Sequence, residues 1–295
     1  MIVFDGFHIF VILTLKTKLA TNDVIYLLFQ ISYLPTLVRS LGIFEHVFTY
    51  LQIVGGENVD IRAVPYQASL LRRGSYTCGC TIISSDLVLT AAHCVMGFKP
   101  QEYTVRVGSS FSSRGGQIYP IGDFVWHPAF TFRNMESDVA LIWLARPIRF
   151  SERVKPIEMF GIGEEIKEGE MTMVTGWGSL LEGGGVPTQL QMVKVPIVSP
   201  EVCNDAYAPL YTISPTMICA GVPEGGLDAC QGDSGGPLAF NGKLAGVVSW
   251  GLGCARPNFP GVYAKVSALR KWIDEQTVTL RMKHILRTPT DEPRI

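Results

Sequence analysis

The sequence lacks several features that mark particular classes of protein. It has no run of basic residues and a formal net charge of -1, so we expect no nucleic-acid partner. It has no Asn-x-Ser/Thr sequon, and so offers no glycosylation signal of export. Cys78 and Cys80 have no second close cysteine pair or histidine cluster beside them, which argues against a zinc site. The strand–helix alternation of a parallel sheet is also absent, and this favours antiparallel β structure.

The chain does have enough apolar residues for a large core, and its cysteines indicate oxidation. Of its 295 residues, 47% are hydrophobic and 17% are charged. This length suits one or two domains, and antiparallel β folds often use about 200 residues as one unit. An odd number of cysteines in an exported protein indicates disulfides with one thiol left over. The seven are Cys78, Cys80, Cys94, Cys203, Cys219, Cys230 and Cys254.

Residues 1–52 differ in composition from the rest of the chain. They are apolar and contain no cysteine, but Asp5 stands where a signal peptide carries basic residues. The longest charge-free run in this segment, residues 24–38, contains Pro35 and is shorter than the ~20 residues of a membrane helix. We interpret residues 1–52 as an atypical apolar leader. A signal, an anchor, a propeptide and a wrongly assigned start all stay open.

After the leader, the sequence reads as short strands separated by glycine-rich turns. Residues 103–107 alternate apolar and polar, as a half-buried strand does. Residues 82–89 contain two apolar runs around a Ser-Ser-Asp turn. Asn241-Gly242 lies between two apolar runs and predicts a hairpin.

Only the end of the chain has a helical pattern. Ser267 is placed to cap a helix that presents apolar residues on one face up to about Gln276. The prolines and charges of residues 277–295 indicate a C-terminal extension without function. As an alternative, residues 278–286 are able to prolong the helix.

Three motifs carry a nucleophile, a base and an acid. Ser234 lies in Gly-Asp-Ser-Gly-Gly, His93 in Thr-Ala-Ala-His-Cys and Asp138 in Ser-Asp-Val-Ala-Leu. Small neighbours let a serine sit on an exposed turn, and glycines let N–H groups converge on one point, as an oxyanion requires. A serine hydroxyl also needs a base, and the base needs a partner that orients it. These residue types therefore indicate acyl transfer through a covalent serine intermediate.

With these motifs in the order His, Asp, Ser, the sequence from Ile53 to about Gln276 resembles the trypsin-like serine proteases of the chymotrypsin family. The resemblance implies an all-β fold of two six-stranded antiparallel β-barrels with a C-terminal helix, and a peptidase domain at residues 53–276. It places His93 and Asp138 in the first barrel and Ser234 in the second. The backbone N–H groups of Gly232 and Ser234 would then form the oxyanion hole.

The resemblance also implies where the substrate binds. Asp228, six residues before Ser234, matches the floor of the pocket for the residue before the scissile bond. A buried carboxylate there favours Arg or Lys, because an unpaired buried charge is costly. Ala229 replaces a common serine, so we expect Arg to be preferred. Gly251 and Gly261 match the pocket walls. The segment Ser249-Trp250-Gly251 matches the strand that pairs with the substrate backbone.

The family pattern implies three disulfides and no metal. The expected pairs are Cys78–Cys94, Cys203–Cys219 and Cys230–Cys254. Cys80 is then left over, either as a small buried thiol or as half of an intermolecular disulfide. The loop at residues 108–117, which binds calcium in some trypsins, contains no acidic residue here. Calcium needs charged oxygen ligands, so we expect neither calcium nor any other cofactor.

Activation is where the sequence departs from the family. Ile53-Val54-Gly55-Gly56 matches the mature start, where cleavage frees an ammonium group that here would pair with Asp233. The preceding residue is Gln52, however, where relatives carry Arg or Lys. Three explanations stay open: a false leader, an activator of different specificity, and a precursor that stays latent.

We therefore predict a secreted, extracellular serine endopeptidase that cleaves after Arg or Lys and is made as a precursor. Its partners would be protein or peptide substrates and protein inhibitors of proteases. We expect a monomer without a membrane tether. The alternatives are a latent or non-catalytic secreted homologue that acts as a binding protein, and a protease tethered through residues 24–38.

Overall fold

The structure is a computed structural model that describes residues 53–286. The predicted leader, Gln52 and the end of the C-terminal extension lie outside the described residues. Within residues 53–286, no helix is both long and apolar enough to cross a membrane. Three short 3-10 helices interrupt the β structure: η2 (Ile53–Gly55), η3 (Ala92–Cys94) and η4 (Pro100–Glu102).

Six antiparallel strands form a first closed barrel, in the order β2-β3-β4-β7-β6-β5. The β5 strand alternates buried and half-buried residues, which confirms the strand that its sequence pattern predicts. In β4 all four residues are buried, because both of its faces are covered. The strands are β2 (Gln67–Arg72), β3 (Ser75–Ile82), β4 (Leu87–Thr90), β5 (Tyr103–Val107), β6 (Gln117–Trp126) and β7 (Ala140–Leu144).

A second ring of six antiparallel strands runs β9-β10-β11-β14-β13-β12 and closes through pairing of β10 with β9. Two short strands join its outside, β1 on β10 and β8 on β13. The predicted pair of six-stranded barrels is therefore confirmed. The strands are β1 (Glu57–Asn58), β8 (Glu158–Met159), β9 (Met171–Gly176), β10 (Gln191–Val198), β11 (Met217–Ala220), β12 (Pro237–Phe240), β13 (Lys243–Trp250) and β14 (Gly261–Lys265).

The hairpin of β12 and β13 forms at the predicted turn. Asn241 and Gly242 both have positive φ, 48° and 78°. Two positive φ angles match the right-handed twist of the flanking strands, and Asn-Gly adopts them at low cost. Phe240 therefore pairs directly with Lys243 across the turn.

The helices differ from the sequence prediction in two respects. A second helix, α1 (Pro200–Tyr207), follows Ser199, whose hydroxyl accepts a hydrogen bond from the Val202 N–H at 3.3 Å. The serine cap and the proline in the first turn are helix-start signals, so the expectation of helix only at the chain end is wrong. The terminal helix α2 (Val266–Ile285) begins after Lys265, and the Ser267 side chain does not cap it.

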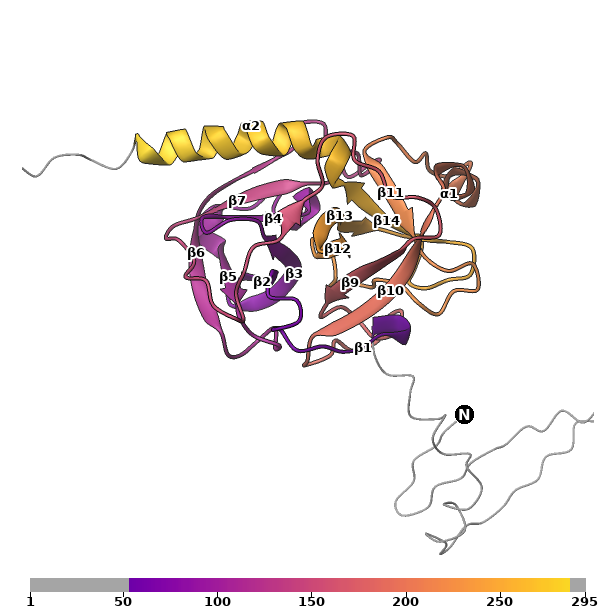
Figure 1. Cartoon of the computed structure of the whole chain (residues 1–295), viewed down its shortest axis with the longest axis horizontal. Coiled ribbons are helices and arrows are strands. Elements are labelled where there is room, and N and C mark those ends of the chain that lie inside the picture. Colours follow the sequence, from indigo (N-terminus) through magenta and orange to yellow (C-terminus); the bar gives the residue numbers. More distant parts are fainter. Residues whose placement is uncertain (1–52, 287–295) are drawn as a thin grey trace, which may run out of the picture. The chain divides into compact units, whose positions relative to one another are not determined.

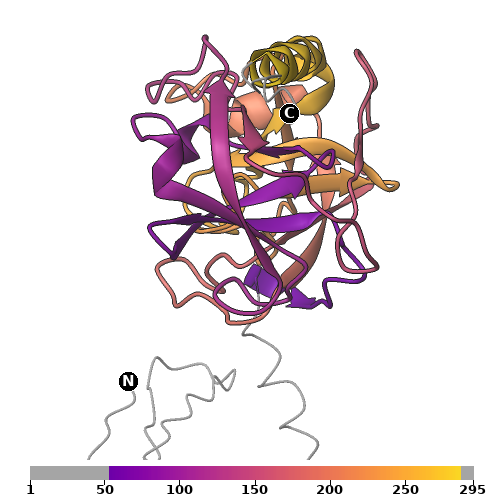
Figure 2. The same cartoon turned by 90° about the vertical axis from the view of Figure 1, so that its left-hand side faces the viewer.

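Helix α2 runs from the second barrel across to the first in Figure 1, and Figure 2 looks along its axis. It continues well beyond Gln276, where the sequence leaves an inert tail and a longer helix both open. Leu280 in this extension is only 4% exposed. At the next residue, the Arg281 guanidinium donates two hydrogen bonds to the carboxylate of Asp86, at 2.8 and 2.9 Å. The described part of the extension, residues 277–286, is thus packed against the first barrel rather than frayed.

The three disulfides form as the family resemblance implies, between Cys78 and Cys94, Cys203 and Cys219, and Cys230 and Cys254. Cys80 is fully buried in β3, and burial raises the pKa of its thiol. A thiol without exposed surface is inert and unavailable to a second chain. Its environment therefore agrees with the interpretation as a small buried side chain.

Candidate active site

His93 and Asp138 both come from the first barrel and lie in direct contact. His93 follows β4 in η3, and Asp138 precedes β7. The His93 Nδ1 lies 2.7 Å from Asp138 Oδ2, and the His93 backbone N–H donates to Oδ1 at 3.0 Å. Because Nδ1 faces a carboxylate that is 1% exposed, it carries the proton and leaves Nε2 able to accept one.

A third group orients the same carboxylate. The hydroxyl of Ser249 in β13 donates to Asp138 Oδ2 at 2.6 Å. The sequence places Ser249 in the substrate-binding strand and does not reveal this contact, since 111 residues separate the partners. With three hydrogen-bonding partners, the Asp138 carboxylate has little freedom to rotate away from His93.

Ser234 lies on the loop between β11 and β12, against the segment that leads to His93. Its carbonyl oxygen accepts a hydrogen bond from Gly79 N–H of β3 at 2.8 Å. A Cβ added to the next residue, Gly235, would collide with Thr90 and lie 3.1 Å from the nitrogen of Ala91. Within the described residues, no hydrogen bond joins the Ser234 hydroxyl to His93. Such bonds often become short only when a substrate is bound.

The backbone around Ser234 presents two unengaged N–H groups. Within residues 53–286, the amides of Gly232 and Ser234 donate to no other group of the protein. Gly232 has a φ of +101°, and a Cβ there would lie 3.1 Å from the Cα of Gly178. Only glycine combines this backbone angle with so close a neighbour. The arrangement suits the binding of an oxyanion beside the serine.

The Asp233 carboxylate is fully buried, and both of its hydrogen bonds come from backbone N–H groups. Its oxygens accept hydrogen bonds from the N–H groups of Gly178 at 2.7 Å and Cys230 at 2.9 Å. Burial nevertheless raises its pKa to about 6. Among the residues that the structure describes, no cationic side chain pairs with it. The site therefore holds a carboxylate that a buried cation would stabilise.

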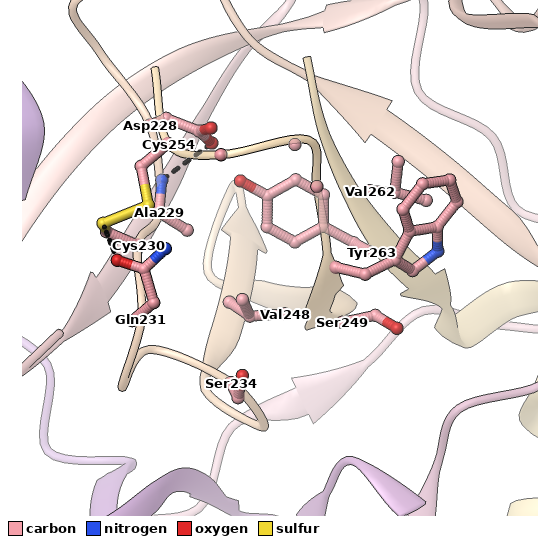
Figure 3. Close-up of a pocket in the computed structure, with 14 residues that line it drawn as sticks. Asp228, Ala229, Cys230, Gln231, Ser234, Val248, Ser249, Cys254, Val262 and Tyr263 are labelled. Carbon is pink, nitrogen blue, oxygen red and sulfur yellow. Dashed lines mark hydrogen bonds between the residues drawn. A yellow bond between two sulfur atoms is a disulfide. The ribbon is translucent and has the colours of Figure 1, made fainter. Parts of the chain in front are cut away.

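A cavity of about 190 Å³ opens beside Ser234. Figure 3 shows Asp228 at one end of it and Ser234 at the other. Asp228 is 5% exposed, and its oxygens accept hydrogen bonds from Ala229 N–H at 2.8 Å and Ala255 N–H at 3.1 Å. Burial raises the pKa of Asp228 to about 7, because two amide donors only partly replace water.

Glycine is present at the two predicted wall positions, Gly251 and Gly261, for different structural reasons. A Cβ on Gly261 would lie 2.6 Å from an Asp228 carboxylate oxygen, so the fold itself requires glycine there. A Cβ on Gly251 would meet nothing closer than 3.7 Å, so glycine at that position leaves room for a ligand. The Tyr263 hydroxyl lines the same cavity and is buried with no hydrogen-bond partner among the described residues.

Trp250 forms an aromatic wall at the pocket rim. Its ring meets the ring of Tyr207 edge-on, with centroids 4.8 Å apart, and its centroid lies 5.2 Å from that of Tyr211.

Ile53, the residue predicted to become the mature chain start, begins η2. The carbonyl of Val54 in η2 accepts a hydrogen bond from Asp228 N–H at 3.4 Å. The cavity is thus lined by the predicted nucleophile and pocket residues, and Ser249 in its wall contacts Asp138 of the His93–Asp138 pair. The chain-start segment contacts the backbone of Asp228 through Val54.

Known proteins with similar sequences point in the same direction. A family model described as Trypsin matches residues 53–273. The chain is 56% identical over 237 residues to a vitellin-degrading protease of Bombyx mori. The matched region covers 80% of this chain and 90% of that protein. It is 40% identical to a trypsin of Phaedon cochleariae (77% of this chain, 89% of that protein) and 44% identical to a trypsin of Simulium vittatum (72% and 87%).

Proposed function

The chain belongs to the trypsin family and is a serine endopeptidase, and we propose that it cleaves peptide bonds after Arg, and less readily after Lys. The single observation that carries this specificity is the buried Asp228 carboxylate at the end of the cavity opposite Ser234. An Arg or Lys side chain that enters the cavity brings the cation that this carboxylate lacks. The unpartnered Tyr263 hydroxyl beside it adds an acceptor for a ligand N–H.

The proposed reaction uses His93, Asp138 and Ser234. The Ser234 hydroxyl attacks the scissile carbonyl carbon while His93 Nε2 takes its proton. The N–H groups of Gly232 and Ser234 stabilise the oxyanion, each donor being worth about 3 kcal/mol of the barrier. His93 then gives the proton to the leaving amine, and an acyl-enzyme remains on Ser234. Water, activated by His93, hydrolyses that ester and restores the free serine.

The preference for Arg over Lys is proposed from Ala229. This residue lines the cavity beside Asp228, and its methyl group offers no hydrogen bond. The guanidinium is a planar fork of several donors and can engage the Asp228 carboxylate directly at two oxygens. The compact Lys ammonium reaches less far and depends more on bridging groups. We expect kcat/KM to be higher for an Arg substrate than for its Lys counterpart, and equal values would contradict this preference.

Activation is proposed to require a free amino group on Ile53. The buried Asp233 carboxylate has no cationic partner, and η2 already lies against the backbone of Asp228. A new ammonium at Ile53 would pair with Asp233 and order the adjoining Gly232 amide. Because Gln52 precedes this bond, we propose an activator that does not cut after Arg or Lys. We also propose that the protein is secreted, because it has three disulfides and because trypsin-like proteases are typically secreted.

The test uses the full chain with an enteropeptidase recognition sequence, Asp-Asp-Asp-Asp-Lys, in place of residues 48–52. Cleavage then frees Ile53 while the rest of the protein is unchanged. Hydrolysis of paired Arg and Lys anilides is measured before and after cleavage, and the same variant with Ser234→Ala is the control. Vitellin, the protein for which the Bombyx mori relative is named, is the first protein substrate to add.

We expect activity on the Arg anilide only after cleavage, and none with Ser234→Ala. An inactive cleaved protein that still folds and keeps its disulfides would overturn the proposal and favour a binding role. Activity before cleavage would overturn the activation step alone.

A further inference from the structure

Tyr76 reaches from the first barrel to the loop that carries the nucleophile. It lies in β3, and its hydroxyl donates a hydrogen bond to the carbonyl oxygen of Gly232 at 2.7 Å. The two residues are 156 positions apart in the sequence. Gly232 is one of the two residues whose N–H groups point to the proposed oxyanion. Within residues 53–286, this bond is also the only hydrogen bond that the Gly232 backbone makes.

The Tyr76 ring is held firmly enough to act as a support. It packs edge-on against Trp177, with ring centroids 5.8 Å apart. A Cβ added to Gly232 would lie 3.7 Å from the Tyr76 ring, so the ring lies beside this backbone. Burial and the neighbouring Asp233 carboxylate keep the pKa of Tyr76 well above its usual value. The hydroxyl therefore remains a proton donor at every pH at which the enzyme works.

Gly232 needs such a support because glycine restricts its own backbone so little. With no Cβ, the residue can rotate among several φ/ψ regions, and each would aim its N–H differently. Donors that stabilise an oxyanion act because they are already oriented toward it. An N–H group without a fixed orientation therefore stabilises the transition state much less. The neighbours Asp233, Ser234 and Gly235 are each tied by backbone hydrogen bonds of their own. The peptide that carries the Gly232 N–H is held by its Gln231 carbonyl, which accepts a hydrogen bond from Ser179 N–H at 2.7 Å. Tyr76 holds the peptide on the other side of Gly232 through the Gly232 carbonyl.

We propose that Tyr76 is a positioning residue of the oxyanion hole. It holds the Gly232–Asp233 peptide, one of the two peptides between which the flexible Gly232 turns, and so helps to keep the Gly232 N–H aimed at the charge that develops on the substrate. Tyr76 contacts neither the substrate pocket nor the reacting atoms. The proposal rests on the proposed protease function. It predicts that loss of the hydroxyl weakens transition-state binding and leaves binding in the Asp228 pocket unchanged.

The experiment compares wild type with Tyr76→Phe, both cleaved before Ile53. Two inhibitors separate the two sites. Benzamidine binds through its amidinium in the Asp228 pocket, whereas a peptide arginine boronate also forms a tetrahedral adduct on Ser234 whose oxygen enters the oxyanion hole. The matched control is Tyr119→Phe, which removes a hydrogen bond of the same length, from Tyr119 to Gln117 within β6.

For Tyr76→Phe we expect kcat on an Arg anilide to fall about five- to tenfold with KM unchanged, and boronate affinity to fall by the same factor. Benzamidine affinity should stay within twofold of wild type, and Tyr119→Phe should match wild type in all three measurements. Equal losses for benzamidine and boronate would mean a general role in folding and would overturn the proposal. So would an unchanged boronate affinity. If cleaved wild type is itself inactive, the proposed function fails first, and this inference fails with it.

Discussion

At the scale of single residues, two carboxylates are buried beside the candidate site, and no cationic side chain within residues 53–286 pairs with either of them. Asp228 and Asp233 are held by amide donors, which only partly replace their hydration. Burial raises the pKa of the first to about 7 and of the second to about 6. Each is thus set to gain from a cation, which in the proposed function comes from the substrate at Asp228 and from the new chain start at Asp233.

The raised pKa of Asp228 predicts pH-dependent binding of cations. Only the ionised carboxylate attracts an amidinium, so affinity is full above pH 7 and weakens as the pH falls through the pKa of about 7. Between pH 8 and pH 6 we expect the Kd of benzamidine to rise about tenfold, since one proton competes with the ligand. Isothermal titration calorimetry across this range measures it.

Asp233, with a pKa of about 6, is a second buried carboxyl beside the site. The same profile in an Asp233→Asn variant and in a His93→Ala variant would assign the titration to Asp228. A Kd that does not change between pH 8 and pH 6 would show that Asp228 is already ionised at pH 6.

At the scale of elements, α2 does more than end the second barrel. Its extension beyond Gln276 buries Leu280 and places Arg281 on Asp86 of the first barrel. Lys283 pairs likewise with Asp123 of β6. The helix thereby connects the two barrels along one side of the molecule (Figure 1). Because the ion pairs are partly exposed, most of the stabilisation comes from the apolar contact.

Leu280→Ala is therefore expected to lower the free energy of unfolding by about 2–4 kcal/mol through lost burial and the cavity left behind. Urea unfolding followed by tryptophan fluorescence measures this change. The control is Val278→Ala in the same part of α2, where the side chain is 62% exposed and the expected change is within about 0.5 kcal/mol. Similar small effects of both substitutions would mean that the extension is not anchored.

At the scale of the whole molecule, the site is assembled from parts that are distant in the sequence. His93, Asp138 and Tyr76 come from the first barrel, while Ser249 and the Ser234 loop come from the second. A buried hydrogen bond of 2.6 Å from Thr175 to Gln67 also joins the two barrels. The candidate active site therefore depends on how the barrels pack.

Cleavage before Ile53 should stabilise the whole protein as well as activate it. A buried ion pair that replaces an unpaired carboxylate is worth about 3–5 kcal/mol, or roughly 6–20 °C in the melting temperature of a domain this size. Calorimetry at pH 7 of the enteropeptidase-cleavable chain, before and after cleavage, measures the shift. In an Asp233→Asn variant the shift should disappear. An equal shift in that variant would mean that the new ammonium pairs elsewhere.

Much of the fold could be predicted because its signals are local. The β5 alternation and the Asn241-Gly242 turn both specify their structure within a few residues. The start of α1 has equally local signals in Ser199 and Pro200, which the overall strand pattern obscured. The end of α2 was harder to predict, because its last turns are stabilised by Asp86 and Asp123 on another barrel. No window of sequence around α2 contains those partners.

The sequence by itself determined the class of this protein, because three motifs in a set order carry the resemblance to the trypsin-like family. That resemblance in turn implied the cysteine pairs, the place of Asp228 in the pocket and the expected start at Ile53. Only the tertiary structure decided how these residues are supported. The Ser249 hydroxyl on Asp138 and the Tyr76 hydroxyl on Gly232 span 111 and 156 positions of the chain. The physical reason is that a motif encodes the groups that react, whereas their orientation depends on contacts made only when two barrels pack together.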